Sequence, residues 1–269
     1  MKLTVLVDNN TFIDEYYCGE PAVCYYIEDS NDKLLLDTGY SDLFIKNALA
    51  LHIDLSSIST IVFSHGHDDH TRGLLYLAEK NLLKGKQIIA HPDTFKQRSQ
   101  DGRFIGAPLS ETNLNEYCRL SLSKKPVHIN EHLTFLGEIP SLNDFEKRKT
   151  FGTIINGDRI SEDRVMDDTA LVYNNGNGLF IITGCSHSGI CNIIEHAKLV
   201  CNENKIQGVI GGFHLFGVSP QLKKTINYFQ ENNIRQLYPC HCVSFDAKAE
   251  IHKYIPIHEV GVGLTITIE

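Results

Sequence analysis

The 269-residue sequence lacks several features that would assign a protein to a particular class. No window approaches the roughly 18–20 apolar residues of a membrane-spanning helix, and no internal repeat or low-complexity tract occurs. No CxxC pair is present, which argues against a zinc knuckle. The net charge is −8 without a long block of like charges, so we expect neither nucleic acid nor a membrane as a partner.

The N-terminus also lacks the pattern of an export signal. It reads MKLTVLVDNNTF, which alternates as a strand does, and no basic region is followed by an apolar stretch and a small-residue cleavage site. We therefore expect a cytoplasmic protein, whose eight cysteines are reduced thiols rather than disulfides. An antibiotic-hydrolysing role outside the cytoplasm is disfavoured for the same reason.

The hydrophobic pattern predicts one α/β domain over residues 1–269. The first part contains short strand-like runs such as KLTVLV, AVCYYIE and KLLLDTG, and in the second half GLFIITG, KIQGVIGG and IRQLYPC alternate with helical stretches. This alternation indicates parallel βαβ units. From about 92 to 165 the pattern becomes turn-rich and charged, with only PVHIN and LTFLGEI typical of strands. We expect an insertion or lid beside the active site there.

A cluster of polar residues, SHGHDDH at 64–70, follows directly after the strand-like run ISTIVF. In a loop, His65 and His67 can turn their imidazoles toward one centre, while Asp69 and His70 can point at an adjacent one. Imidazole and carboxylate together suit zinc, iron or manganese rather than calcium or magnesium. The alternative is a solvated polar loop with an incidental group of histidines.

Three further histidines follow strand-like runs later in the chain. FIITGCSH ends in His187, VIGGFH in His214 and LYPCH in His241. Taken singly, each could be a packed or surface histidine. Ligands of open α/β sheets bind at the carboxyl ends of the strands, so together these residues predict the second half of a metal site.

These motifs resemble those of the metallo-β-lactamase superfamily. SHGHDDHTRGL is similar to its metal-binding signature, and LLLDTG is similar to the strand-end aspartate motif that precedes it. VLVDNN, GCSHSGICNII, GGFHL and PCHC resemble a subfamily of metal-dependent hydrolases, which also includes a methanogen dihydropterin-forming enzyme. The resemblance implies a four-layer αββα sandwich with metals at one edge of the two sheets.

The resemblance also implies two sets of metal ligands. His65 and His67 would hold the first metal with a third histidine, for which we choose His187. The second metal would be held by Asp69, His70 and His241. Asp37 of LLLDTG would orient the histidine loop through a hydrogen bond, unless it is only a turn-forming aspartate.

The chain departs from the family pattern at several positions. Cys185 stands where many members have a bridging aspartate; its thiolate could bridge two metals, but we favour a small buried residue. Cys240 and Cys242 are expected to be structural and to point away from His241. One residue and one neighbouring pair stay open between solvent and the pocket. Asp68 faces substrate or solvent. Asp167 and Asp168 face the metals or the substrate, with Asp168 as a catalytic residue or one that supports the metal ligands, or they form a solvated loop.

The function expected from these residues is hydrolysis of a small phosphorylated or ester-type metabolite by a metal-activated water. The cofactor would be one or two divalent metal ions, with zinc as the choice and iron or manganese as alternatives. His214 or an aspartate of the 167–168 pair could shuttle the proton. Basic residues of the lid could attract a phosphate or could simply be solvated: Arg98, Arg103, Lys147, Arg148 and Lys149.

Two other functions stay open. The first is a transferase that joins a dihydropterin to a ribofuranosylaminobenzene 5'-phosphate, with Phe104, Phe145 or Phe151 stacking on the pterin unless these rings belong to the core. The second is a redox or sensor protein with a di-iron site. For either enzymatic function, the expected partner is a small-molecule substrate. The sequence also leaves a homo-oligomer open.

Overall fold

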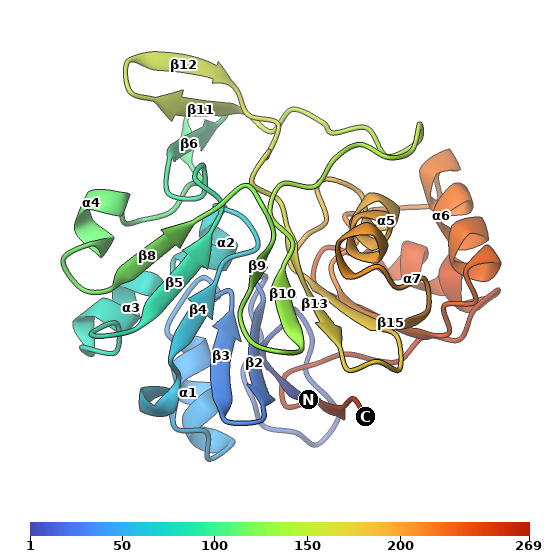
Figure 1. Cartoon of the computed structure of the whole chain (residues 1–269), viewed down its shortest axis with the longest axis horizontal. Helices are drawn as coiled ribbons and strands as arrows, with labels where there is room; N and C mark the ends of the chain where they lie inside the picture. The colour runs from blue at the N-terminus through green and yellow to red at the C-terminus, as the bar shows by residue number, and fades with distance from the viewer.

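The computed structural model describes residues 1–269, and most of its strands belong to two large sheets (Figure 1). The first sheet has the order β17-β1-β2-β3-β4-β5-β8. Its strands are β1 (Lys2–Val7), β2 (Cys24–Asp29), β3 (Asp32–Leu36), β4 (Thr60–Val62), β5 (Gln87–Ala90), β8 (Arg119–Leu122) and β17 (Thr265–Thr267). Because β17 pairs antiparallel with β1, the two ends of the chain lie side by side.

The second sheet has the order β16-β15-β14-β13-β10-β9. Its strands are β9 (Val127–His128), β10 (Leu133–Phe135), β13 (Ala170–Asn174), β14 (Leu179–Thr183), β15 (Ile206–Gly211) and β16 (Gln236–Pro239). Strands β14, β15 and β16 are parallel neighbours, as the βαβ pattern of the sequence predicts.

Both large sheets are buried on both faces, which explains their continuous apolar runs. Along β2, Tyr25 and Ile27 join the core between the sheets, whereas Cys24 and Tyr26 join the core under the first layer of helices. The inner core also takes Leu171 and Ile182 from the second sheet. The two sheets therefore pack face to face through alternate residues of each strand.

Helices cover the outer face of each sheet. On the first sheet lie α1 (Leu43–Ala50) and α3 (Leu74–Glu79), with the 3₁₀ turn η1 (Leu55–Ser57) following α1; the short helix α2 (Asp68–Thr71) follows the loop after β4. On the second lie α5 (Ile190–Cys201), α6 (Pro220–Glu231) and α7 (Phe245–His252). The expected αββα sandwich is thus confirmed. Every helix falls short of the length and apolar character that crossing a lipid bilayer requires.

The segment from about 92 to 165 requires a correction, because it is divided among three sheets. Strand β8 pairs parallel with β5, and β9 and β10 belong to the second sheet. Only β6 (Gln97–Gln100), β7 (Arg103–Phe104), β11 (Thr153–Asn156) and β12 (Arg159–Glu162) form a separate sheet, which we call the lid sheet. The short helix α4 (Glu111–Leu114) connects β7 to β8. The sequence pattern missed β8 because its RLSL run has only two apolar residues.

Candidate metal centre

The candidate site lies where strands of both large sheets end. The loop after β4 carries His65 and His67 and leads into α2, which carries His70; the loop after β14 carries Cys185 and His187. Since β14, β15 and β16 run parallel, their carboxyl ends meet at one edge, which also brings in His214 and His241. The structure therefore gathers histidines from four separate loops.

The first group of donor atoms comes from His65, Cys185 and His187, whose donors all lie within 4.8 Å of one another. His67 adjoins it, because its Nδ1 lies 3.1 Å from Nε2 of His65 and its ring centroid 5.0 Å from that of His187. Nε2 of His67 and both ring nitrogens of His187 are buried without any hydrogen-bond partner. Buried polar atoms are rarely left unpaired, so these nitrogens fit a metal ion.

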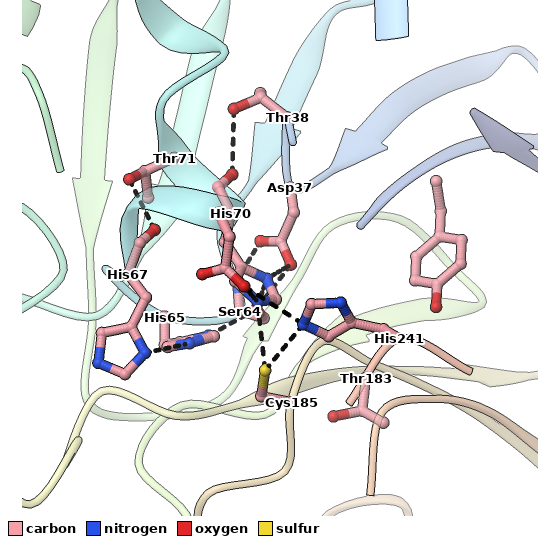
Figure 2. A network of polar contacts seen from close by, with 12 residues as sticks. Asp37, Thr38, Ser64, His65, His67, His70, Thr71, Thr183, Cys185 and His241 are labelled. Atoms are coloured by element: carbon pink, nitrogen blue, oxygen red, sulfur yellow. Dashed lines mark hydrogen bonds and ion pairs between the residues drawn. The ribbon is translucent and has the colours of Figure 1, made fainter. Parts of the chain in front are cut away.

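The second group comes from His70, Cys185 and His241 (Figure 2). The sulfur of Cys185 lies 3.2 Å from Nε2 of each of these two histidines. Oδ2 of Asp69 lies 3.5 Å from Nε2 of His70 and 3.4 Å from Nε2 of His241. Cys185 thus belongs to both groups and stands between them, rather than serving only as a small packed residue.

The histidines of the first group are held in the neutral form that binds metals. Burial, together with the charge of Arg98, lowers the pKa of His67 to about 4. Burial and the neighbouring imidazoles place the pKa values of His65 and His187 well below the usual range. At neutral pH these rings are already uncharged, so they can bind a metal without first releasing a proton.

The second group holds protons that a metal must displace. Burial lowers the pKa of His70, but the carboxylates of Asp69 and Asp37 outweigh it and place this pKa well above the usual value. For His241, burial is likewise outweighed, chiefly by the hydrogen bond to Asp69, and the pKa is raised. Burial raises the pKa of the Cys185 thiol well above its usual value. Metal binding at this group therefore releases protons.

Asp37, at the end of β3, holds the first histidine loop in place. Its buried carboxylate accepts hydrogen bonds from the backbone N–H of Ser64 (2.8 Å), the hydroxyl of Ser64 (2.7 Å) and Nδ1 of His70 (2.7 Å). The bond to Nδ1 leaves Nε2 of His70 facing Cys185 (Figure 2). Asp37 has a left-handed backbone with φ of 60°, which aspartate tolerates better than most residues. The structure places it where the sequence predicts an orienting carboxylate.

Asp167 and Asp168 support the loops of the site from behind the ligands, which is the supporting role that the sequence leaves open for Asp168 besides catalysis. Both are fully buried, and neither belongs to the two donor groups. Asp168 accepts hydrogen bonds from the backbone N–H of His187 and of Ser188, each 2.9 Å long. Asp167 accepts from the backbone N–H of Gly66 at 2.8 Å. These carboxylates fix the two loops that carry the first group.

Two residues that hold His241 were not assigned a role from the sequence. Oδ2 of Asp8 accepts from the backbone N–H of His241 at 2.9 Å, and Oδ1 of Asn9 lies 3.1 Å from its Nδ1. The signal was the motif VLVDNN, which places polar side chains directly after β1. Cys240 is buried against Tyr25, as expected of a structural residue. Cys242 belongs to neither donor group, and its thiol donates to the carbonyl of Cys185 at 3.4 Å, but it also lines the cleft, which the sequence did not predict.

Backbone strain concentrates in the loops of this site. Ser186, His214 and His241 all have left-handed conformations, with φ of 60°, 50° and 49°. Each such residue costs on the order of 1 kcal/mol or more and persists only where the surroundings determine it. The loops are therefore held in one arrangement by their contacts, as sites that bind a ligand often are.

A cleft of about 360 Å³ opens over the two groups and includes His67, His187 and His241 in its wall. Phe151 and Phe216 line it, together with Asp68. Of the other aromatic candidates, Phe104 is exposed on the lid sheet and Phe145 packs against the core of the second sheet. Only Phe151 of the three expected rings therefore reaches the cleft.

His214 also lines the cleft and adjoins the first group. Its ring centroid lies 4.4 Å from that of His187 and 5.1 Å from that of Phe151. Burial and the charge of Lys149 lower the pKa of His214 to about 4. The ring is thus neutral at neutral pH and belongs to neither donor group.

The basic residues of the lid segment differ in their surroundings. Lys147 and Lys149 are exposed and line a small recess beside His187 and His214. Arg148 donates to the carbonyls of Val165 and Ile139, and Arg103 is exposed. Arg98 contradicts both expectations for it, because it is buried in ion pairs with two aspartates.

Comparisons with known proteins agree with this geometry. A family profile described as the metallo-beta-lactamase superfamily matches residues 19–108. An uncharacterized protein of Methanocaldococcus jannaschii is 33% identical over 254 residues, which cover 93% of this chain and 93% of that protein. A second protein of that organism, named 7,8-dihydropterin-6-methyl-4-(beta-D-ribofuranosyl)-aminobenzene-5'-phosphate synthase, is 29% identical over 263 residues, covering 92% of this chain and 89% of the synthase.

Among solved structures, a crystal structure described as a metal-dependent hydrolase of the beta-lactamase superfamily has a TM-score of 0.84 and 30% identity. The match covers 100% of this chain and 99% of the other. Fold, ligand pattern and relatives agree, and the chain belongs to the metallo-beta-lactamase superfamily.

Proposed function

We propose that the protein is a metal-dependent hydrolase of a small phosphorylated or ester-type metabolite. The observation that carries this proposal is the pair of donor groups that share Cys185 beneath an open cleft. The similar structure that is described as a metal-dependent hydrolase supports it. Neutral imidazoles, a carboxylate and a thiol form a donor set that suits zinc, with iron or manganese as alternatives.

Each donor group would hold one metal. His65, His67 and His187 would bind the first with Cys185, and Asp69, His70 and His241 would bind the second with the same sulfur. A divalent metal, when bound, polarises a substrate oxygen and lowers the pKa of water from about 15.7 toward about 7. Asp37 would orient the ring of His70, and Asp168 would hold the backbone of His187, through the hydrogen bonds described above.

The remaining cleft residues would bind and orient the substrate. The neutral ring of His214 can donate a hydrogen bond to a substrate oxygen beside His187. Asp168 is unsuited to shuttle a proton, since its oxygens already accept bonds from the His187 loop. Lys147 and Lys149 border the recess next to His214 and would attract an anionic group such as a phosphate.

The test is a substrate panel of phosphomonoesters, phosphodiesters and lactones, measured after reconstitution with zinc, iron or manganese. The proposal predicts hydrolysis that a chelator abolishes and that the His67→Ala variant lacks. Chelator-resistant hydrolysis, or full activity in metal-free His67→Ala protein, would contradict it. Loss of activity in the variant must be accompanied by an unchanged circular-dichroism spectrum, so that unfolding is not the cause.

A second candidate is a pterin transferase, which the 29% identical synthase favours. Phe151 and Phe216 at the cleft offer aromatic faces for a planar ring. In this reaction a carbon–nitrogen bond forms between an activated dihydropterin and an arylamine while diphosphate leaves. Incubation with a dihydropterin diphosphate and an arylamine ribofuranosyl phosphate separates the two functions: a coupled product supports transfer, and a hydrolysed pterin alcohol supports hydrolysis.

A further inference from the structure

The lid sheet is joined to the rest of the molecule by a buried arginine. Arg98, on β6, is 1% exposed and is one of the largest fully buried side chains of the chain. Its Nε donates to Asp163 at 2.8 Å, and its Nη2 donates to Asp167 at 2.6 Å. Asp163 follows β12, so this pairing also joins β6 to the end of β12, from which β11 separates it in the sheet.

The same ion pair reaches the metal-ligand loop. Oδ1 of Asp167 accepts from Arg98, while its Oδ2 accepts from the backbone N–H of Gly66 at 2.8 Å. Gly66 stands between the ligands His65 and His67. The loop is thus separated from the guanidinium of Arg98 by a single carboxylate.

Close packing at Gly66 makes this contact unusually tight. A Cβ atom added there would lie 1.9 Å from Nη1 of Arg98 and 2.0 Å from the carbonyl oxygen of Thr94. Nη1 itself donates to that carbonyl at 3.3 Å. The guanidinium therefore occupies the space that any side chain at 66 would need, and it fixes the loop from the lid side.

The second donor group is supported by different residues. His70 is held by Asp37, and His241 is held by Asp8 and Asn9. None of the hydrogen bonds made by Arg98 reaches these residues or Cys185. Arg98 therefore supports only the first group directly, although the two groups share one sulfur and Asp37 also holds Ser64 beside His65.

We propose that Arg98 is a positioning residue for the first metal-ligand group, acting through Asp167 and the backbone of Gly66. This inference rests on the metal-binding part of the proposed function, not on the reaction catalysed. Strand β6, which carries Arg98, also brings Gln100 to the wall of the cleft. Arg98 therefore also sets the distance between this wall and the metal ligands. A planar guanidinium can donate to two carboxylates at once through N–H groups in fixed directions. The ammonium group of lysine does not have this geometry.

The test measures zinc affinity by chelator competition with the metal-free protein, in two backgrounds that each keep one group. In His241→Ala, which retains the first group, Arg98→Lys is expected to weaken zinc binding about 10- to 100-fold, the usual effect of removing support from a metal ligand. In His65→Ala, which retains the second group, the same substitution is expected to leave the affinity unchanged. Arg159→Lys, an exposed arginine on β12, is the matched control and should change neither affinity.

Cobalt substitution adds a readout that a general loss of stability does not move. Arg98→Lys should alter the visible spectrum of cobalt in the first group and leave the spectrum of the second group unchanged. If the lysine variant does not fold, the triple variant Arg98→Met, Asp163→Asn and Asp167→Asn removes the charges together and should give the same selective loss. Equal affinities in parent and variant, or equal losses in both backgrounds, would overturn the inference.

The outcomes separate this inference from the proposed function. A parent protein that binds zinc but hydrolyses nothing in the panel leaves the role of Arg98 intact. A parent that binds no metal overturns both.

Discussion

The carboxylate of Asp37 offers the most direct test of how the metal loop is held. Asp37→Ala removes the acceptor for three buried donors, namely the backbone N–H of Ser64, its hydroxyl and Nδ1–H of His70. Each donor left unpaired costs about 1–3 kcal/mol, although the Ser64 hydroxyl can turn to His65 instead. Two donors without an acceptor give a loss of about 2–6 kcal/mol.

The backbone of Asp37 adds to this loss. A left-handed conformation disfavours alanine by roughly 1–2 kcal/mol relative to glycine or asparagine. We therefore expect Asp37→Ala to lower the free energy of unfolding by about 3–8 kcal/mol, a large part of the total stability of a domain. Asp37→Asn keeps one carbonyl acceptor and the tolerance for this backbone, so it should lose clearly less.

The assay is urea unfolding of the metal-free proteins, monitored by circular dichroism, which gives the free energy of unfolding of each variant. Asp101→Ala is the matched control, because Asp101 shares the left-handed backbone (φ of 50°) but is exposed on the lid sheet turn. It isolates the backbone contribution from the loss of the acceptor. An Asp37→Ala variant as stable as Asp101→Ala would refute the reasoning, since the three hydrogen bonds would then contribute nothing measurable.

Four further predictions concern the metal centre. His67→Ala should abolish metal binding at the first group, which metal titration of the folded variant checks; retention of two full-affinity sites would count against the assignment. Cys185→Ser should weaken zinc binding at both groups, whereas Cys118→Ser, at a cysteine that packs against the core under the first layer of helices and belongs to neither group, should weaken neither. Zinc affinity should rise with pH, because His70 and Cys185 have raised pKa values and must release protons; calorimetry in buffers of different ionisation enthalpy measures this release, and a pH-independent affinity would be inconsistent with it. Lys149→Gln should raise KM several-fold for a phosphorylated substrate and leave a neutral ester unaffected; equal effects on both would exclude a charge contact.

Much of the fold could be predicted from the sequence because its strands are buried on both faces. Runs such as LLL at 34–36 and LFII at 179–182 have no polar interruption, and the polar residues that follow them mark the strand ends. The histidines could be grouped for the same reason, since parallel strands bring their carboxyl ends to one edge. Each of these inferences needs only local pattern and the geometry of a sheet.

The lid segment could not be predicted in this way. Strands β6 and β12 are largely polar, and β11 has only two apolar residues, so their sequences resemble loops. The burial of Arg98 depends on Asp163 and Asp167, which are 65 and 69 residues away in sequence. No local pattern distinguishes a buried, paired arginine from a solvated one.

The supporting carboxylates were difficult for a related reason. Asp8, Asp167 and Asp168 were visible as polar residues at strand ends, but their partners are backbone N–H groups of distant loops. A backbone N–H carries no sequence signature. The shared position of Cys185 likewise depends on the distance between two loops, which only the folded chain defines.

The central claim is that the histidines, Asp69 and Cys185 form a metal centre. Elemental analysis of the protein, purified without added metal or chelator, tests it most directly. We predict one or two equivalents of a transition metal, with zinc foremost, and a marked loss of that metal in folded His67→Ala protein. Folded parent protein without bound metal, and with no affinity for added zinc, would contradict the account.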